Sequence, residues 1–271
     1  MKVGILAHKK TPENLMIYEE FLKNNVSIEF IDPLEIINGN ENFNFDLILS
    51  RVERVFLNEG LYALTELQNN FKVINCAETV NLCQNKYLTY QKLKEVSPKS
   101  IMTYSKDFNT VFSNVKKLFG YPFVLKPIYG GYGEGVLKIN SKHEFLNTFK
   151  ELTKNNSEIF IQEYIEYLHD IRVFVINNEI IGAMERIPKN NWKANYSLGA
   201  EIKEIELSKD VKNMVLDSVK KVGADIVGVD VLVSKTKNYI LEMNITPQFR
   251  GMMNFVNVSR KIVDYCMDLM E

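Results

Sequence analysis

Two apolar segments near the C-terminal end carry polar side chains in positions that could bind a metal ion. Ile226–Val233 holds Asp230 in its middle, and Tyr239–Asn244, beyond a short turn, holds Glu242 and Asn244. Strand side chains two residues apart share a face, so a hairpin of these segments can place Asp230 opposite Glu242 and Asn244. Neighbouring buried carboxylates repel each other unless a proton or a cation lies between them. Two carboxylates and an amide suit Mg²⁺; the alternative is a surface hairpin whose acids meet solvent or the lysines of the turn.

A glycine-rich segment at 130–135 is the second candidate for chemistry. Four of its six residues are glycines, which cost backbone entropy and occur where a chain approaches a ligand closely or moves. No Gly-Lys-Ser/Thr ends the segment and a strand follows it, so it is neither a P-loop nor a dinucleotide-binding turn. It has the form of a flap over nucleotide phosphates, for which Lys126 on the preceding strand supplies a cation. The alternative is an ordinary glycine-rich hairpin turn.

Polar residues at the end of the apolar segment Phe160–Ile165 have the groups that a nucleotide requires. Backbone groups of Glu163 to Ile165 can read the edge of an adenine, and the carboxylate of Asp170 can hold ribose hydroxyls. The alternative is a set of solvated charges at the end of a strand.

Two arginines, Arg172 and Arg186, alternate with apolar neighbours on successive predicted strands. Arginines in such positions can clamp a phosphoryl group in transfer or a developing oxyanion. The alternative is a pair of ordinary ion pairs, with Glu185 or Glu204 as a partner.

The elements that would position these residues fall into three predicted domains. Residues 1–93 alternate short strands with helices, which predicts a mostly parallel sheet of the α/β class. Residues 94–162 contain the strand, glycine loop and strand as a small lid domain. Residues 163–271 contain long hairpins with helices between them, which predicts an α+β domain. A single helix is expected over Thr79–Val96, ending before Pro98.

Composition and charge exclude several classes of protein. The 271 residues are 46% hydrophobic and 25% charged, which is typical of a soluble globular protein. No apolar run reaches the ~18 residues of a membrane span, and the first residues lack the features of a signal peptide, so we expect a cytoplasmic protein. The net charge is −1, without a block of like charge, so no nucleic-acid partner is expected. Three scattered histidines make a histidine metal site improbable, and the three cysteines are expected to be buried or inert.

In order and spacing, these segments resemble the ATP-grasp superfamily, specifically its RimK-like branch of carboxylate–amine ligases. The resemblance runs from Asn85-Lys86 to Gly251, with a compatible N-terminal domain. It is carried by Leu125-Lys126-Pro127 with the glycine loop, by Gln162-Glu163-Tyr164-Ile165 with Asp170-Ile171-Arg172, by Ala183-Met184-Glu185-Arg186, and by Gly228-Val229-Asp230 with Glu242-Met243-Asn244. It implies the ATP-grasp fold with an N-terminal parallel-sheet domain, and ATP and Mg²⁺ as cofactors with Mn²⁺ as a substitute. It also implies a small-molecule, coenzyme or carrier substrate and a homo-oligomer, either a dimer or a tetramer.

The resemblance further implies a role for each matching position. Arg172 and Arg186 are the implied catalytic residues that face the acyl phosphate, and Asp230, Glu242 and Asn244 are the implied ligands of one or two magnesium ions. The implied nucleotide-binding residues are Lys86, Lys126, Gly131, Tyr132, Gly133, Glu134, Gly135, Gln162, Glu163, Tyr164, Ile165 and Asp170. The implied substrate residues are Arg51, Asn195, Arg250 and Gly251.

Two positions depart from the family pattern. The loop begins Gly130-Gly131 where the family often has Gly-Ser or Gly-Thr, which changes the stiffness of the flap. The site ends in Pro247-Gln248-Phe249-Arg250-Gly251, where the ribosomal-protein ligases usually have Pro-Gly and no arginine. Arg250 is therefore a candidate for reading a substrate carboxylate, as are Arg51 and Arg54, with ordinary surface charge as the alternative. These arginines favour an acidic substrate such as glutamate or aminoadipate.

The combined prediction is an ATP-dependent ligase that makes an amide through an acyl phosphate. A carboxylate attacks the γ-phosphorus of ATP with help from Mg²⁺ and cationic side chains, and an amine then attacks the acyl phosphate under a closed flap. The rivals are a non-catalytic ATP-binding protein on the same fold, as in synapsins, and a kinase or carboxylase on that scaffold. The intact set of Asp230, Glu242 and Asn244 argues against the non-catalytic protein.

Overall fold

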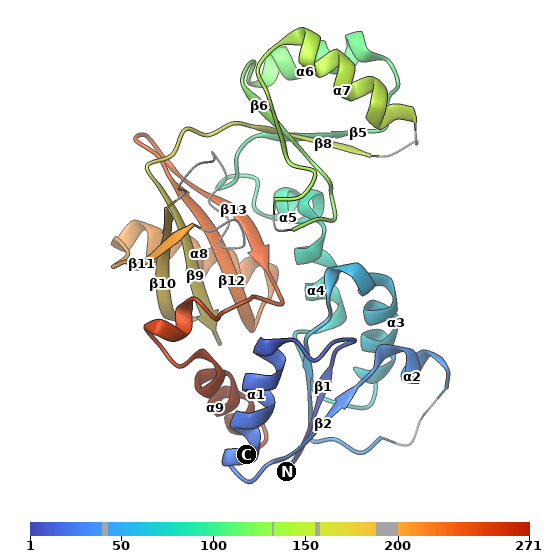
Figure 1. Cartoon of the computed structure of the whole chain (residues 1–271), viewed down its shortest axis with the longest axis vertical. Coiled ribbons are helices and arrows are strands. Elements are labelled where there is room, and N and C mark those ends of the chain that lie inside the picture. The colour runs from blue at the N-terminus through green and yellow to red at the C-terminus, as the bar shows by residue number, and fades with distance from the viewer. Residues whose placement is uncertain (40–42, 132, 155–157, 188–199) are drawn as a thin grey trace.

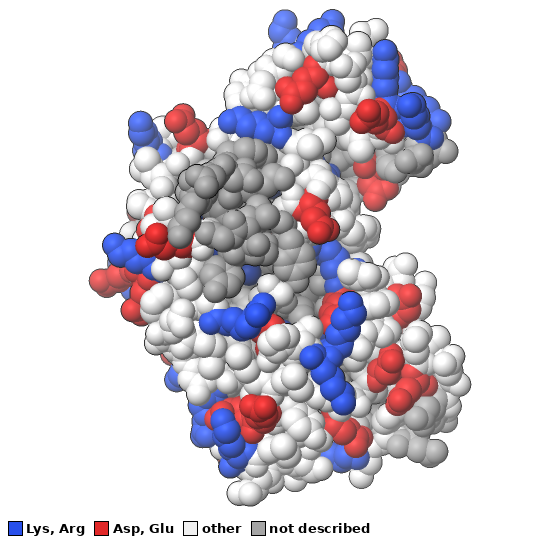
Figure 2. All heavy atoms as spheres, in the orientation of Figure 1, with Lys and Arg blue, Asp and Glu red and all other residues white. Residues whose placement is uncertain are grey.

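The computed structural model describes residues 1–39, 43–131, 133–154, 158–187 and 200–271. Within these residues the strands form a parallel sheet, a lid sheet and a large antiparallel sheet, with the parallel sheet and the lid sheet at opposite ends of the molecule (Figure 1). No helix in this part of the chain is long and apolar enough to span a membrane. Acidic and basic side chains are interspersed over the face shown in Figure 2, as the near-zero net charge implies.

The parallel sheet confirms the predicted α/β character of the N-terminal segment. Its strand order is β2-β1-β3-β4, so the chain moves to one side of β1 for β2 and to the other side for β3. In such sheets the crevice beyond the carboxyl ends, at the reversal of strand order, is where ligands bind. The strands are β1 (Lys2–Leu6), β2 (Ser27–Ile31), β3 (Leu47–Ser50) and β4 (Val73–Ile74), and the helices are α1 (Pro12–Lys23), α2 (Pro33–Ile37), the 3₁₀ helix η1 (Arg54–Phe56) and α3 (Leu57–Leu67).

The lid sheet is antiparallel, in the order β5-β8-β6-β7, and it has an aromatic core of its own. Phe123, Phe145 and Phe149 are fully buried between the sheet and two helices. The glycine-rich segment joins β6 to β7, as predicted. The elements are β5 (Ser100–Thr103), α6 (Phe108–Leu118), β6 (Phe123–Lys126), β7 (Leu137–Ile139), α7 (Lys142–Lys154) and β8 (Ile159–Glu163).

The large antiparallel sheet has the order β11-β10-β9-β12-β13. The predicted hairpin is confirmed, because β12 pairs with β13 in a register that places Asp230 opposite Glu242. On its other side, β12 pairs with β9 so that Asp230 lies opposite Arg172. The elements are β9 (His169–Ile176), β10 (Glu179–Ile187), β11 (Glu201–Glu204), α8 (Lys209–Val222), β12 (Ile226–Val233), β13 (Asn238–Asn244), the 3₁₀ helix η3 (Met252–Asn254) and α9 (Val258–Asp268).

The single helix expected over Thr79–Val96 is wrong, because the chain breaks at Asn85 into α4 (Ala77–Gln84) and α5 (Lys86–Lys92). Asn85 has an extended backbone, and its side chain accepts hydrogen bonds from the backbone N–H groups of Tyr87 and Leu88. This cap satisfies donors that a continuous helix would have bonded to the preceding turn. The strands β5 and β11 and the helix α2 were also absent from the prediction.

The parallel sheet and the large sheet share their apolar cores. Leu6 and Ile48 belong to the same buried cluster as Val173 and Val229, and α9 packs its buried face against α1. Of the cysteines, Cys83 and Cys266 are buried as expected, whereas Cys76 is partly exposed.

Candidate active site

The nucleotide cavity, as we name it, lies between the lid sheet and the large sheet and has a volume of about 120 Å³. Most of the predicted nucleotide residues line it. These are Lys86, Lys126, Gly131, Gly133, Glu134, Gln162, Glu163, Tyr164, Ile165 and Asp170. Gly135 lies just outside the lining with a φ of +66°, near Pro127, and Tyr132 falls outside the described residues.

Two lysines enter this cavity from different elements. Lys126 Nζ donates to Gln162 Oε1 at 2.6 Å, whereas Lys86 Nζ donates to the carbonyl of Gly130 at 2.7 Å and lies 3.0 Å from Glu242 Oε1. Burial lowers the pKa of Lys126 to about 8. Anionic phosphates in the cavity would favour the charged form further, so the two lysines suit a nucleotide.

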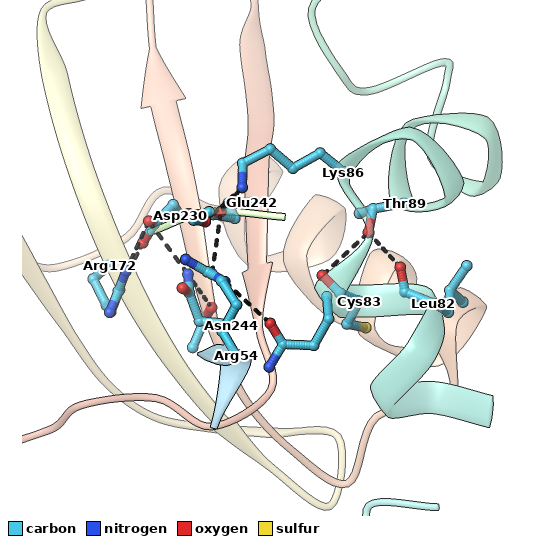
Figure 3. Close-up of polar contacts among 12 residues, drawn as sticks. Arg54, Leu82, Cys83, Lys86, Thr89, Arg172, Asp230, Glu242 and Asn244 are labelled. Carbon is cyan, nitrogen blue, oxygen red and sulfur yellow. Dashed lines mark hydrogen bonds and ion pairs between the residues drawn. The ribbon is translucent and has the colours of Figure 1, made fainter. Parts of the chain in front are cut away.

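The acids of the large sheet are held by arginines (Figure 3). Arg172 donates to both oxygens of Asp230, with Nε at 2.6 Å and Nη2 at 2.8 Å. Arg186 bonds Asp170 through Nε at 2.7 Å and lies 3.3 Å from Asp230. The expected alternative partners, Glu185 and Glu204, are therefore wrong. The actual partners are Asp170 of β9 and Asp230 of β12.

Burial decides how these groups behave. Asp230 is only 4% exposed, so the alternative of a surface hairpin is wrong, and Lys237 of the turn bonds the carbonyl of Glu95 instead. Burial raises the pKa of the Asp230 carboxyl, but Arg172 and Arg186 outweigh burial and leave the pKa below its ordinary value.

The residues expected to hold a metal ion lie together. Glu242 is paired with Asp230 across the strands, and Asn244 Nδ2 donates to Asp230 Oδ2 at 3.3 Å. Within the described residues no group of three or more His, Cys, Asp or Glu is placed to hold a metal ion, and the predicted donor set remains two carboxylates and an amide. Those oxygen donors fit Mg²⁺, which keeps several positions for water and phosphates. Lys86 and the arginines neutralise the same carboxylates in this structure.

The substrate cavity, as we name the second one, has a volume of about 400 Å³ and lies beyond the carboxyl ends of β1 and β3. It shares Gly131, Arg186 and Glu242 with the nucleotide cavity, so the two meet at these residues. Its charged and polar lining includes Lys9, Glu13, Asn14, Arg51, Glu53, Arg54, Arg172, Arg186, Glu242, Asn244, Gln248 and Arg250, and the predicted Gly251 also lies there. Asn195 falls outside the described residues.

Sequence reasoning missed several polar residues of this cavity, among them Glu13 and Asn14 at the start of α1. Glu13 is 1% exposed; its Oε1 accepts from Arg250 Nε at 3.0 Å, and within the described residues its Oε2 has no hydrogen-bond partner. Asn14 accepts from Arg51 Nε at 2.8 Å, and Arg51 also donates to the carbonyl of Pro247. The signal available in the sequence was their position directly after the first strand of a parallel sheet.

A lid that lays a glycine loop over a cavity beside the carboxylates of a second sheet is the architecture of ATP-grasp proteins. The structure matches that of the ATP-grasp ligase PsnB complexed with minimal precursor, Mg and ADP, with a TM-score of 0.75 and 16% identity, over 99% of this chain and 97% of that chain.

The chain belongs to the RimK-like ATP-grasp family, whose domain model matches residues 82–266. It is 33% identical over 250 residues to the glutamate–LysW ligase ArgX of Sulfolobus acidocaldarius, over 85% of this chain and 88% of the relative. It is 30% identical over 294 residues to the tetrahydromethanopterin:alpha-L-glutamate ligase of Methanocaldococcus jannaschii, over 97% of each chain. The resemblance noted in the sequence is thus confirmed, and the chain is an ATP-grasp ligase.

Proposed function

We propose that this ligase uses ATP to activate a carboxylate as an acyl phosphate and then joins it to an amine. The observation that carries this proposal is the meeting of the two cavities at Gly131, Arg186 and Glu242. A nucleotide in the first cavity and a carboxylate in the second would bring the γ-phosphorus and the attacking oxygen together there. Holding reactants in line and neutralising charge is the main contribution that an enzyme makes to phosphoryl transfer.

The nucleotide roles follow from the lining. Backbone groups of Glu163 to Ile165 would read the adenine, Asp170 would hold the ribose, and Lys86 and Lys126 would contact the phosphates. Asp230, Glu242 and Asn244 would hold Mg²⁺, or Mn²⁺ in its place, which neutralises phosphate charge when bound. Because cationic side chains already neutralise these carboxylates, metal and nucleotide would have to exchange with part of that network.

We propose that an acidic amino acid binds in the substrate cavity, as either the carboxylate or the amine substrate, with glutamate as the first candidate. Arg51 and Arg250 offer guanidinium groups for its carboxylates. The Oε2 of Glu13, which has no hydrogen-bond partner in the part of the chain that the structure describes, is a buried acceptor that suits an ammonium group. Two relatives are named glutamate ligases, one acting with the carrier LysW and the other on tetrahydromethanopterin. The second substrate is therefore proposed to be a coenzyme, a carrier or another small molecule, and the protein to act as a dimer or tetramer.

The experiment is ADP release from MgATP by the purified protein, with carboxylic acids crossed against amino-acid amines. We expect ADP only when both an acid and an amine are present, with glutamate among the active partners. Glu242→Ala should lower turnover by at least about 100-fold, because it removes a carboxylate proposed to hold the Mg²⁺ that neutralises phosphate charge. The matched control is Glu204→Ala on the exposed edge strand β11, which should be as active as wild type. ADP release from ATP without an acid and an amine, or an undiminished rate of ADP release in Glu242→Ala, would contradict the proposal.

A further inference from the structure

Arg54, considered from the sequence only as a reader of a substrate carboxylate, lies at the place where the two cavities meet. It begins η1 after the loop that follows β3, and its side chain points toward Glu242 of the large sheet (Figure 3). Arg54 lines the substrate cavity, and two of its neighbours, Gly131 and Glu242, line both cavities. With a nucleotide in one cavity and a carboxylate in the other, a group at this place would lie beside both.

The guanidinium of Arg54 is positioned but only loosely paired. Its Nε donates to Gln84 Oε1 at 3.3 Å, which fixes the plane of the group. Its Nη2 lies 3.8 Å from Glu242 Oε1, which is too long for a hydrogen bond. By contrast, Arg172 and Arg186 bond carboxylates directly, with Nε–oxygen distances of 2.6 and 2.7 Å. Among the described residues Arg54 is thus the arginine of this junction whose Nη donors are most open to an anion.

The glycine loop lies directly on this guanidinium. A Cβ atom placed on Gly131 would be 1.8 Å from Arg54 Nη1 and 2.9 Å from Arg54 Cζ, closer than any real contact. A side chain at this position would push the flexible end of Arg54 away, so the glycine lets the guanidinium keep its place beside the loop. The flap and Arg54 are therefore fitted to each other.

We infer that Arg54 is a catalytic residue of this chain, which binds the γ-phosphoryl group under the flap and stays on it during transfer. This inference rests on the proposed function. A carboxylate oxygen forms a bond to the γ-phosphorus while the bond from that phosphorus to the bridging oxygen breaks, and ADP leaves with the electron pair. The charge on the equatorial oxygens of the phosphoryl group is what the two Nη donors of Arg54 stabilise.

The test compares the affinities of ADP and of a non-hydrolysable ATP analogue, both with Mg²⁺, by calorimetry. Arg54→Ala should weaken binding of the triphosphate analogue by about 10-fold or more while leaving ADP affinity within about twofold of wild type. The kcat of Arg54→Ala for ligation should decrease by about 100-fold to 1,000-fold. The kcat of Arg54→Lys should lie between those of wild type and Arg54→Ala. The matched control is Arg260→Ala, an arginine of α9 far from both cavities, which should change neither affinity. Equal loss for both nucleotides, or no loss for either, would overturn the assignment.

A double-mutant cycle tests the contact itself and does not depend on turnover. Gly131→Ala alone should weaken analogue binding, because its methyl group would overlap Arg54 Nη1. In the Arg54→Ala background the same methyl group has room, so the second substitution should cost much less. Strict additivity would overturn the inferred fit of flap and arginine.

Thermal unfolding of each variant separates misfolding from weak binding, and Arg54→Lys, which keeps the charge, serves if Arg54→Ala does not fold. If wild type lacks acid-dependent ADP release, the proposed function fails while the ADP and analogue comparison still decides the phosphoryl contact.

Discussion

Lys126 lines the nucleotide cavity, and its charge would respond to phosphates bound there. Its pKa is lowered from 10.5 to about 8, first by burial and then by the neighbouring cation Lys86, whereas the nearby carboxylate of Glu242 acts in the opposite direction. Phosphates bound beside Nζ would favour the ammonium form and raise the pKa again. A group whose pKa rises on binding takes up protons, and the affinity that depends on it falls as the pH rises above the pKa of the free protein.

We therefore predict that ATP affinity falls as the pH rises through about 8 and that binding takes up a proton on the alkaline side of that value. Calorimetry in two buffers with different ionisation enthalpies measures the proton uptake directly. Lys126→Met is the control, because it should bind ATP more weakly and lose the uptake near pH 8. An affinity that does not change across this range in wild type would show that Lys126 does not contact the phosphates.

At the scale of elements, the break between α4 and α5 is what turns Lys86 toward the cavity. Asn85 caps α5 through its Oδ1, and its Nδ2 donates to the hydroxyl of Tyr129 at 2.8 Å, next to the glycine loop. Lys86 follows directly as the first residue of α5. One residue thus ends a helix, starts another through its side chain and precedes the lysine that we propose contacts phosphate.

Asn85→Ala should lower the free energy of unfolding by about 1 kcal/mol, because it leaves backbone donors of α5 without a cap. It should also weaken binding of an ATP analogue, since Lys86 loses its fixed starting point. Denaturant titration and analogue binding measure the two effects, with Asn85→Asp as the control that keeps a capping oxygen. Unchanged stability in Asn85→Ala would mean that α5 does not depend on this cap.

The sequence predicted those elements whose pattern is local. The period of two along β12 and β13 placed Asp230 opposite Glu242, and the observed register agrees. Strand alternation likewise predicted the parallel sheet. The break at Asn85 was missed because a capping side chain competes with an apolar pattern that continues through it.

The partners of the site residues could not be predicted, because tertiary register sets them. Arg172 meets Asp230 across β9 and β12, at a separation of 58 residues. Arg250 meets Glu13 from the opposite end of the chain, at a separation of 237 residues. No local pattern encodes such pairs; they follow only from how the sheets pack.

At the scale of the whole molecule, the packing of the sheets creates two cavities that meet at Gly131, Arg186 and Glu242. The parallel sheet and the large sheet share buried clusters that include Val173 and Val229, so the walls of the substrate cavity are held as one unit. The lid has its own aromatic core around Phe145 and contributes Lys126 and Gln162 to the lining of the nucleotide cavity. A lid with its own core, placed beside two sheets that share a core, suits closure over ATP and exclusion of water from an acyl phosphate.

The central claim is that the γ-phosphoryl group of ATP in one cavity passes to a carboxylate in the other, which forms an acyl phosphate. Isotope transfer tests this claim most directly. The carboxylate substrate identified by the ADP assay is labelled with heavy oxygen, and the phosphate released during ligation is analysed by mass spectrometry. We predict one heavy oxygen in each phosphate released, because the attacking carboxylate oxygen leaves with the phosphoryl group when the amine displaces it. Phosphate that carries no heavy oxygen while the amide accumulates would contradict the account.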